Sequence, residues 1–206
     1  MPVKPVRPFL ITRRSIIAAA SGLAFAGGWS NSASAQFDES DLPDAVDAMN
    51  KVMPTPAPPL VFTDAKGKRL TLADYAGHTL VVNLWATWCP PCIMELPGLA
   101  ALALKIKPSG GLVLPISIDL NGASAVQPFY AKNDIHGLPV LLDPDGKNLQ
   151  ILHTDGIPVT IIINAAGQMV ARLDGAAYWN SKRMVAFLQS LGGPPPAKAK
   201  HGAVPL

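Results

Sequence analysis

An apolar strand that runs into a closely spaced cysteine pair constrains this chain more than any other feature. Residues 79–86 are almost continuously apolar, which is typical of a strand covered on both faces of a sheet. The motif Cys89-Pro-Pro-Cys92 follows after two residues, and apolar residues then recur at helical spacing at Leu99, Leu102 and Ile106. The sequence therefore predicts a buried strand followed directly by a helix that the cysteine pair opens.

The start of a helix favours a thiolate at Cys89. Pro90 and Pro91 fit a first helical turn, whose N–H groups lack partners, and the helix dipole favours negative charge there. Thiols of C-x-x-C pairs at helix starts have pKa values lowered to roughly 3.5–7.5. We therefore assign Cys89 as the attacking thiolate, and Cys92, one turn inside the helix and more buried, as the resolving thiol of a redox-active disulfide.

Disulfide exchange is not the only use that two cysteines at this spacing can have. A structural zinc site needs two further ligands, but there is no third cysteine, and the four histidines are isolated: His78, His136, His153 and His201. An inert disulfide closing so short a loop constrains little, and a peroxidase is less favoured still. A copper(I) carrier stays open as the alternative, because two thiolates alone hold copper(I). No cofactor and no other metal site is predicted.

The first 35 residues have the layout of a secretory signal. Arg13 and Arg14 precede a modestly apolar run over residues 16–28, and small residues end the segment at Ala33-Ser-Ala35. Paired arginines before weak hydrophobicity resemble a twin-arginine signal, which predicts cleavage after Ala35 and a periplasmic protein without stable membrane insertion. An uncleaved anchor is the alternative, although the run is shorter than the roughly 20 apolar residues that span a bilayer.

The charge of the mature chain argues against nucleic acid as a partner. The whole sequence has 17 Lys and Arg against 14 Asp and Glu, but four of the basic residues lie in the first fourteen positions. Without residues 1–35, the balance is 13 to 14, with no basic run. Phosphate-backbone binding needs a clustered positive surface, which this composition does not provide.

The predicted elements after the signal follow an α/β order. Residues 36–57 are expected to be an N-terminal segment with a short amphipathic helix and a Pro-rich linker, residues 58–191 the domain, and residues 192–206 a disordered tail. Inside the domain, a second buried strand is expected at 112–119, helices at 124–133 and 181–191, and a hairpin at 159–164 and 168–173. A central mixed sheet flanked by helices follows.

Residues 82–97 resemble the thioredoxin-like family of exported TlpA and ResA type thiol-disulfide oxidoreductases. That family has a W-C-x-P-C motif with a Glu three residues after the second cysteine, here Glu95. The likeness extends to residues 156–160, where the fold carries a cis-proline that faces the dithiol, and to residues 175–179, which are similar to the TlpA type. The resemblance implies a thioredoxin-like fold over residues 58–191.

The resemblance also implies roles for particular residues. Trp88, Ile157 and Pro158 are expected to bind substrate, and Glu95 to take the proton of Cys92, unless it is an ordinary solvated Glu on the helix surface. Thioredoxins carry a buried Asp in the strand before the motif, where this chain has Asn83. Trp85 is expected to pack in the core, together with Met94, Leu99 and Leu102.

The function implied is an exported thiol:disulfide oxidoreductase that reduces disulfides of periplasmic client proteins. Clients of the family are copper-site proteins of cytochrome oxidase assembly or apocytochrome c, which places the chain in cytochrome biogenesis. An upstream membrane thiol reductant would supply the electrons.

Overall fold

The strand predicted around residues 79–86 is the centre of the sheet. A computed structural model describes residues 39–192, so the predicted signal and all but the first residue of the predicted tail lie outside the described residues. β4 (Thr79–Trp85) is buried at every position. It pairs in parallel with β5 (Gly111–Ser117) and antiparallel with β7 (Val159–Ile163). A strand enclosed on both faces and both edges explains the continuous apolar run.

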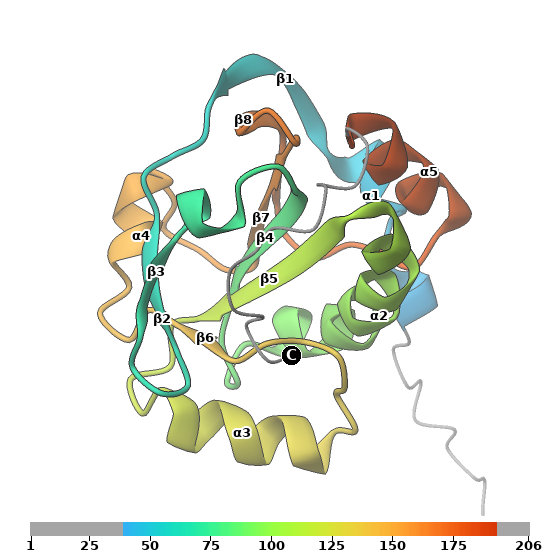
Figure 1. The fold of residues 1–206 in the computed structure, drawn as a ribbon. Coiled ribbons are helices and arrows are strands. Elements are labelled where there is room, and N and C mark those ends of the chain that lie inside the picture. The colour runs from blue at the N-terminus through green and yellow to red at the C-terminus, as the bar shows by residue number, and fades with distance from the viewer. Residues whose placement is uncertain (1–38, 193–206) are drawn as a thin grey trace, which may run out of the picture. The chain divides into compact units, whose positions relative to one another are not determined.

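The strands of the described residues form one mixed sheet with the order β1-β8-β7-β4-β5-β6-β2-β3 (Figure 1). The remaining strands are β1 (Asn50–Pro56), β2 (Val61–Asp64), β3 (Arg69–Thr71), β6 (Leu141–Leu142) and β8 (Gln168–Asp174). The α-helices are α1 (Ala45–Ala48), α2 (Pro90–Ile106), α3 (Ala123–Lys132), α4 (Lys147–Ile151) and α5 (Lys182–Leu191). Short 3-10 helices are η1 (Glu39–Asp41), η2 (Leu72–Tyr75) and η3 (Lys107–Ser109).

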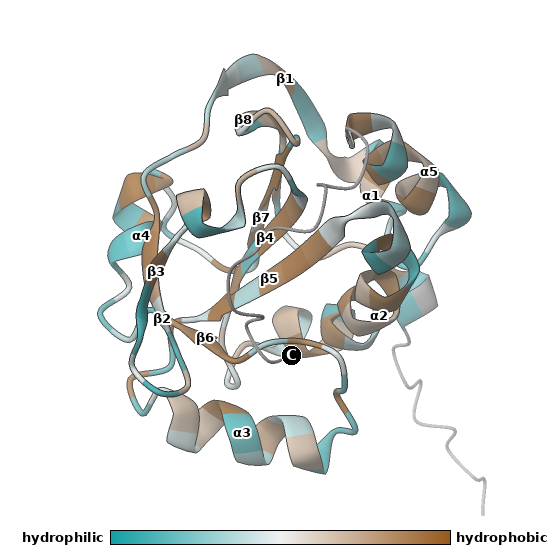
Figure 2. Cartoon of the chain, in the orientation of Figure 1, coloured by the Kyte–Doolittle hydropathy of each residue, from teal (hydrophilic) through white to brown (hydrophobic). Residues whose placement is uncertain are grey.

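The apolar core lies on both faces of the sheet. Alternate β4 side chains belong to different layers: Val81 and Trp85 pack with α2 and α5, whereas Leu80, Val82 and Leu84 pack with β2, β3 and η2. Figure 2 shows this as apolar colouring along the central strands. Trp85 is fully buried and stacks on Tyr130 of α3, which confirms its expected packing role. Leu99 and Leu102 are core residues as expected, and Met94 is half-buried.

Most of the predicted elements are present, including the central mixed sheet flanked by helices. The helix after the cysteine pair is α2, the predicted helices at 124–133 and 181–191 are α3 and α5, and the predicted hairpin is β7–β8. The part of the chain that the structure describes contains no helix with both the length and the apolar character needed to cross a membrane.

The expected Pro-rich linker differs most from the structure. Residues 50–56 are strand β1, which pairs antiparallel with β8 and has an irregular register between Lys51 and Thr55. The prolines of this segment, Pro54 and Pro56, are tolerated because β1 lies at the sheet edge, where a residue without an N–H need not break a ladder. The sheet therefore begins before residue 58, and the short helix expected within residues 36–57 is the four-residue α1.

Candidate active site

Cys89 and Cys92 form a disulfide at the start of α2. Cys89 is the N-cap residue, and its Sγ accepts a hydrogen bond of 3.3 Å from the backbone N–H of Cys92. Pro90 and Pro91 occupy the first helical turn, as the sequence predicts. Cys89 is 4% exposed and Cys92 is fully buried, in the predicted order. An N–H group and the helix dipole both point at the sulfur of Cys89, which favours negative charge there.

The loop before β7 lies beside Cys89. The bond between Ile157 and Pro158 is cis, as the resemblance implies, and the carbonyl oxygen of Ile157 lies 3.7 Å from Cys89 Sγ. Pro158 is buried, and its carbonyl oxygen accepts a hydrogen bond from the backbone N–H of Gly175, the residue that follows β8. The loop is therefore fixed against the disulfide.

A pocket of about 370 Å³ opens at Cys89. Trp88 lines it together with Ile118, Leu149 and Ile157, and Asp155 is its charged residue. Trp88 is 64% exposed, an unusual position for so large an apolar side chain. Two of the three residues expected to bind substrate, Trp88 and Ile157, thus share one apolar pocket with Cys89.

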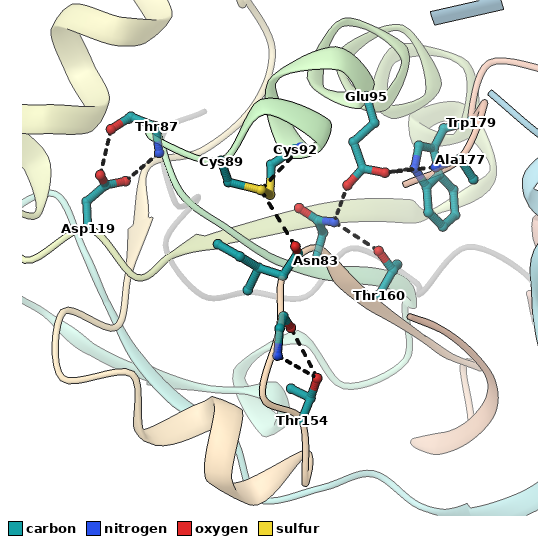
Figure 3. Close-up of a disulfide and its surroundings, with 12 residues drawn as sticks. Asn83, Thr87, Cys89, Cys92, Glu95, Asp119, Thr154, Thr160, Ala177 and Trp179 are labelled. Carbon is teal, nitrogen blue, oxygen red and sulfur yellow. Dashed lines mark hydrogen bonds between the residues drawn. A yellow bond between two sulfur atoms is a disulfide. The ribbon is translucent and has the colours of Figure 1, made fainter. Parts of the chain in front are cut away.

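Glu95 lies inside the protein, so the alternative of a solvated surface Glu is wrong. Its Oε1 accepts a hydrogen bond of 2.8 Å from Asn83 Nδ2, and its Oε2 accepts from Trp179 Nε1 at 2.8 Å and Ala177 N at 3.1 Å (Figure 3). Burial raises the pKa of Glu95 to about 7; the three hydrogen bonds oppose this shift, and the charge of Glu39 adds to it. The carboxyl group can gain or lose a proton near neutral pH.

Asn83 joins Glu95 to the neighbouring strand. It is fully buried on β4, opposite Thr160 of β7, and its Nδ2 also donates a hydrogen bond of 2.9 Å to Thr160 Oγ1. A carboxamide at this position accepts and donates hydrogen bonds but does not titrate in the physiological range. Glu95 is the ionisable side chain of this buried network.

The sequence reasoning missed two supports of the site. Trp179 and Ala177 hold Glu95, although they lie more than 80 residues away along the chain. Asp119 accepts hydrogen bonds from Thr87 N at 2.9 Å, Thr87 Oγ1 at 2.6 Å and Ser117 Oγ at 2.7 Å. Because β4 and β5 are parallel, their carboxyl ends meet at one edge, and this geometry could have pointed to Asp119.

The hydrogen bond from Trp179 gives a first prediction. Trp179→Phe keeps an aromatic ring but removes the donor to Glu95, which should raise the pKa of Glu95 further and destabilise the protein by about 1–3 kcal/mol above pH 8. Urea unfolding at pH 8.5 measures the loss. In a Glu95→Gln background, the same substitution should cost distinctly less; an equal cost in both backgrounds would mean that only packing is lost.

Residues 53–172 match the AhpC/TSA family, a stretch that covers more than half of the chain. The chain belongs to this family. The chain is similar to the thiol:disulfide interchange protein DsbE of Pseudomonas aeruginosa, with 32% identity over 163 residues that cover 76% of this chain and 84% of that protein. It is also similar to the thiol-disulfide oxidoreductase ResA of Bacillus thuringiensis subsp. konkukian, with 30% identity over 119 residues, 58% of this chain and 68% of that protein.

Solved structures agree on the fold. A thioredoxin family thiol:disulfide interchange protein from Chlorobium tepidum superposes with a TM-score of 0.55 at 24% identity, covering 68% of this chain and 99% of that one. A secreted thiol-disulfide isomerase from Corynebacterium glutamicum superposes with a TM-score of 0.58 at 19% identity, covering 69% of this chain and 92% of that one. The fold is thioredoxin-like, as the resemblance implies. Because its relatives are thiol-disulfide oxidoreductases and its fold is thioredoxin-like, the chain is a thiol-disulfide oxidoreductase of the TlpA and ResA type.

Proposed function

We propose that this enzyme is an exported reductase of client disulfides in the periplasm, with Cys89 as the attacking thiolate and Cys92 as the resolving thiol. The observation that carries the proposal is the placement of the pair. Cys89 lies at a helix N-cap beside an apolar pocket, and Cys92 is fully buried one turn behind it. A thiolate favoured beside an open pocket and a second thiol held inside suit attack followed by resolution.

The proposed reaction is a pair of thiol-disulfide exchanges. The Cys89 thiolate attacks one client sulfur, the client disulfide breaks, and the other client sulfur leaves and takes a proton. Cys92 then gives up its proton and attacks Cys89 Sγ, which releases the second client thiol and forms the Cys89–Cys92 disulfide. Two electrons pass to the client, and an upstream membrane thiol reductant returns two electrons to the enzyme.

Glu95 is proposed to accept the proton that Cys92 releases. Its carboxyl group lies one helical turn from Cys92 on the same helix, and burial raises its pKa to about 7. A base is most effective when its pKa is near the working pH. The Asn83 of this chain takes no proton at the place where thioredoxins have an Asp, which leaves Glu95 as the buried acceptor.

The pocket supports an apolar client segment beside the reacting cysteine. Trp88, Ile157 and Pro158 are proposed to bind this segment, because the first two line the pocket and the third directly follows Ile157 in the loop beside Cys89. We propose cytochrome biogenesis as the setting, with copper-site proteins of oxidase assembly favoured over apocytochrome c. The likeness of residues 175–179 to the TlpA type supports that order.

The reduction potential tests the direction of electron flow. Equilibration of the purified mature protein with dithiothreitol or glutathione buffers should give a value at or below the range of glutaredoxins, about −200 to −230 mV. A value near −120 mV, typical of a strong oxidant, would contradict a reductase. Stoichiometric, tight copper(I) binding by the reduced protein with no disulfide reductase activity would favour the copper carrier instead.

Export through the twin-arginine route is a separate prediction. Arg13 and Arg14 lie outside the described residues, and their replacement by lysine should leave full-length precursor in the cytoplasm. Fractionation and mass spectrometry measure this result, with a mature wild-type chain that starts at Gln36 as the reference. Normal export of the variant would indicate the general secretory route, and an intact N-terminus in the membrane fraction would indicate an anchor.

A further inference from the structure

Asn83 has one polar atom that the oxidised protein does not use. Its Nδ2 donates to both Glu95 and Thr160, while its Oδ1, fully buried, has no hydrogen-bond donor among the described residues. Buried side-chain oxygens are rarely left without a partner, because removal from water costs free energy that only a new hydrogen bond repays. An orphaned acceptor at this place points to a donor that exists in another state of the enzyme.

This acceptor points toward the disulfide (Figure 3). Val81 and Trp85, two residues on either side of Asn83 along β4, pack in the layer that contains α2, so Asn83 faces the same layer. Cys92 and Glu95 lie one turn apart on α2, and both are fully buried. Figure 3 shows the Asn83 side chain between the disulfide and Glu95, with its oxygen toward the sulfur atoms. In the disulfide, neither sulfur carries a hydrogen to donate.

We infer that Asn83 is a positioning residue for the resolving thiol, and that Cys92 S–H donates a hydrogen bond to Asn83 Oδ1 once the disulfide is reduced. A dithiol donor supplies two electrons and two protons, the Cys89–Cys92 bond breaks, and the donor becomes a disulfide. Cys92 keeps its proton in the interior, whereas the helix start favours loss of the proton from Cys89. The new thiol at Cys92 thereby meets the acceptor that lacks a donor in the oxidised protein.

This hydrogen bond would belong to one redox state alone. It stabilises the reduced form relative to the disulfide, and it favours the protonated form of Cys92, so the two thiols of the pair become unequal. Through Nδ2, the same carboxamide holds Glu95, which keeps the thiol and the carboxyl group on opposite ends of one rigid group. The inference rests on the reversible reduction of the pair, which is part of the proposed function, but not on the client or the direction of flow.

Asn83→Leu tests the inference through the reduction potential. The substitution keeps a similar volume and removes the acceptor, so the dithiol-disulfide equilibrium should move three- to tenfold toward the disulfide, which lowers the potential by about 15–30 mV. The matched control is Asn148→Leu. Asn148 is equally buried, but both ends of its amide are bonded to the backbone of Val61, so its loss should destabilise both redox forms alike. An unchanged potential in Asn83→Leu, or an equal shift in the control, overturns the inference.

An infrared measurement decides the matter if Asn83→Leu does not fold. Cys89→Ser leaves Cys92 as the single thiol, beside a native Asn83. Its S–H stretch should lie below that of an unbonded thiol. An unbonded frequency in Cys89→Ser itself would contradict the inference. A wild-type potential near −120 mV would contradict the reductase proposal, but the shift in potential of Asn83→Leu and the S–H frequency of Cys92 would still test the role of Asn83.

Discussion

Cys92→Ser is expected to hold client proteins covalently on Cys89 and to reduce disulfide reductase turnover to background. The mixed disulfide still forms, but the internal thiol that cleaves it is gone. Cys89→Ser should also lose turnover, yet should trap far fewer clients, because Cys92 is fully buried and cannot reach a client disulfide. Both variants are expected to fold, since a disulfide that closes so short a loop adds little stability.

Non-reducing electrophoresis and mass spectrometry of affinity-purified variants measure the trapping. Complexes that disappear with dithiothreitol and map to Cys89 would support the assignment, and the proteins captured would name the clients. Circular dichroism of both variants provides the control for folding. If Cys89→Ser captured more clients than Cys92→Ser, the two roles would have to be exchanged.

Glu95 is expected to make the stability of the folded protein depend strongly on pH. Burial raises the pKa of Glu95 from an ordinary value of 4.5 to about 7. Between these values the unfolded chain has released this proton while the folded protein still holds it, so unfolding releases a proton. Rising pH then favours unfolding, and the oxidised protein should lose about 3 kcal/mol of stability from pH 4.5 to 7.

Glu95→Gln should remove most of this slope. The stability contribution of a raised pKa is fully present below about pH 4.5 and is lost as the pH passes about 7, whereas a glutamine at the same place does not titrate. Urea unfolding of both proteins at intervals from pH 4 to 8.5 gives the comparison. Parallel stability curves for the wild type and the variant would show that Glu95 does not titrate in this range.

Long apolar patterns were enough to predict the centre of the fold. β4 and β5 are buried on both faces, and α2 and α5 carry apolar residues at helical spacing, so their signals do not depend on distant residues. Pro54 and Pro56 are unusual in strands, so the sequence predicts a linker where the structure has β1. Only its pairing with β8, more than 100 residues further along the chain, makes this segment a strand.

In the candidate site too, the sequence predicts the residues whose role is local and not those whose surroundings come from distant parts of the chain. The chemistry of Cys89 and Cys92 follows from their spacing at a helix start, which is a local property. The environment of Glu95 is not local, because its partners come from β4 and from the segment after β8. A Glu on a helix is most often solvated, so its burial could be learned only from the folded arrangement.

Alkylation of the reduced protein as a function of pH, with the modified cysteine identified by mass spectrometry, tests the assignment of Cys89 as the attacking thiolate. At pH 6, iodoacetamide should modify Cys89 rapidly and Cys92 scarcely at all, because a helix start favours the Cys89 thiolate and the interior encloses Cys92. Preferential modification of Cys92, or a Cys89 whose reactivity rises only near the ordinary thiol pKa of about 8.5, would contradict the proposed mechanism.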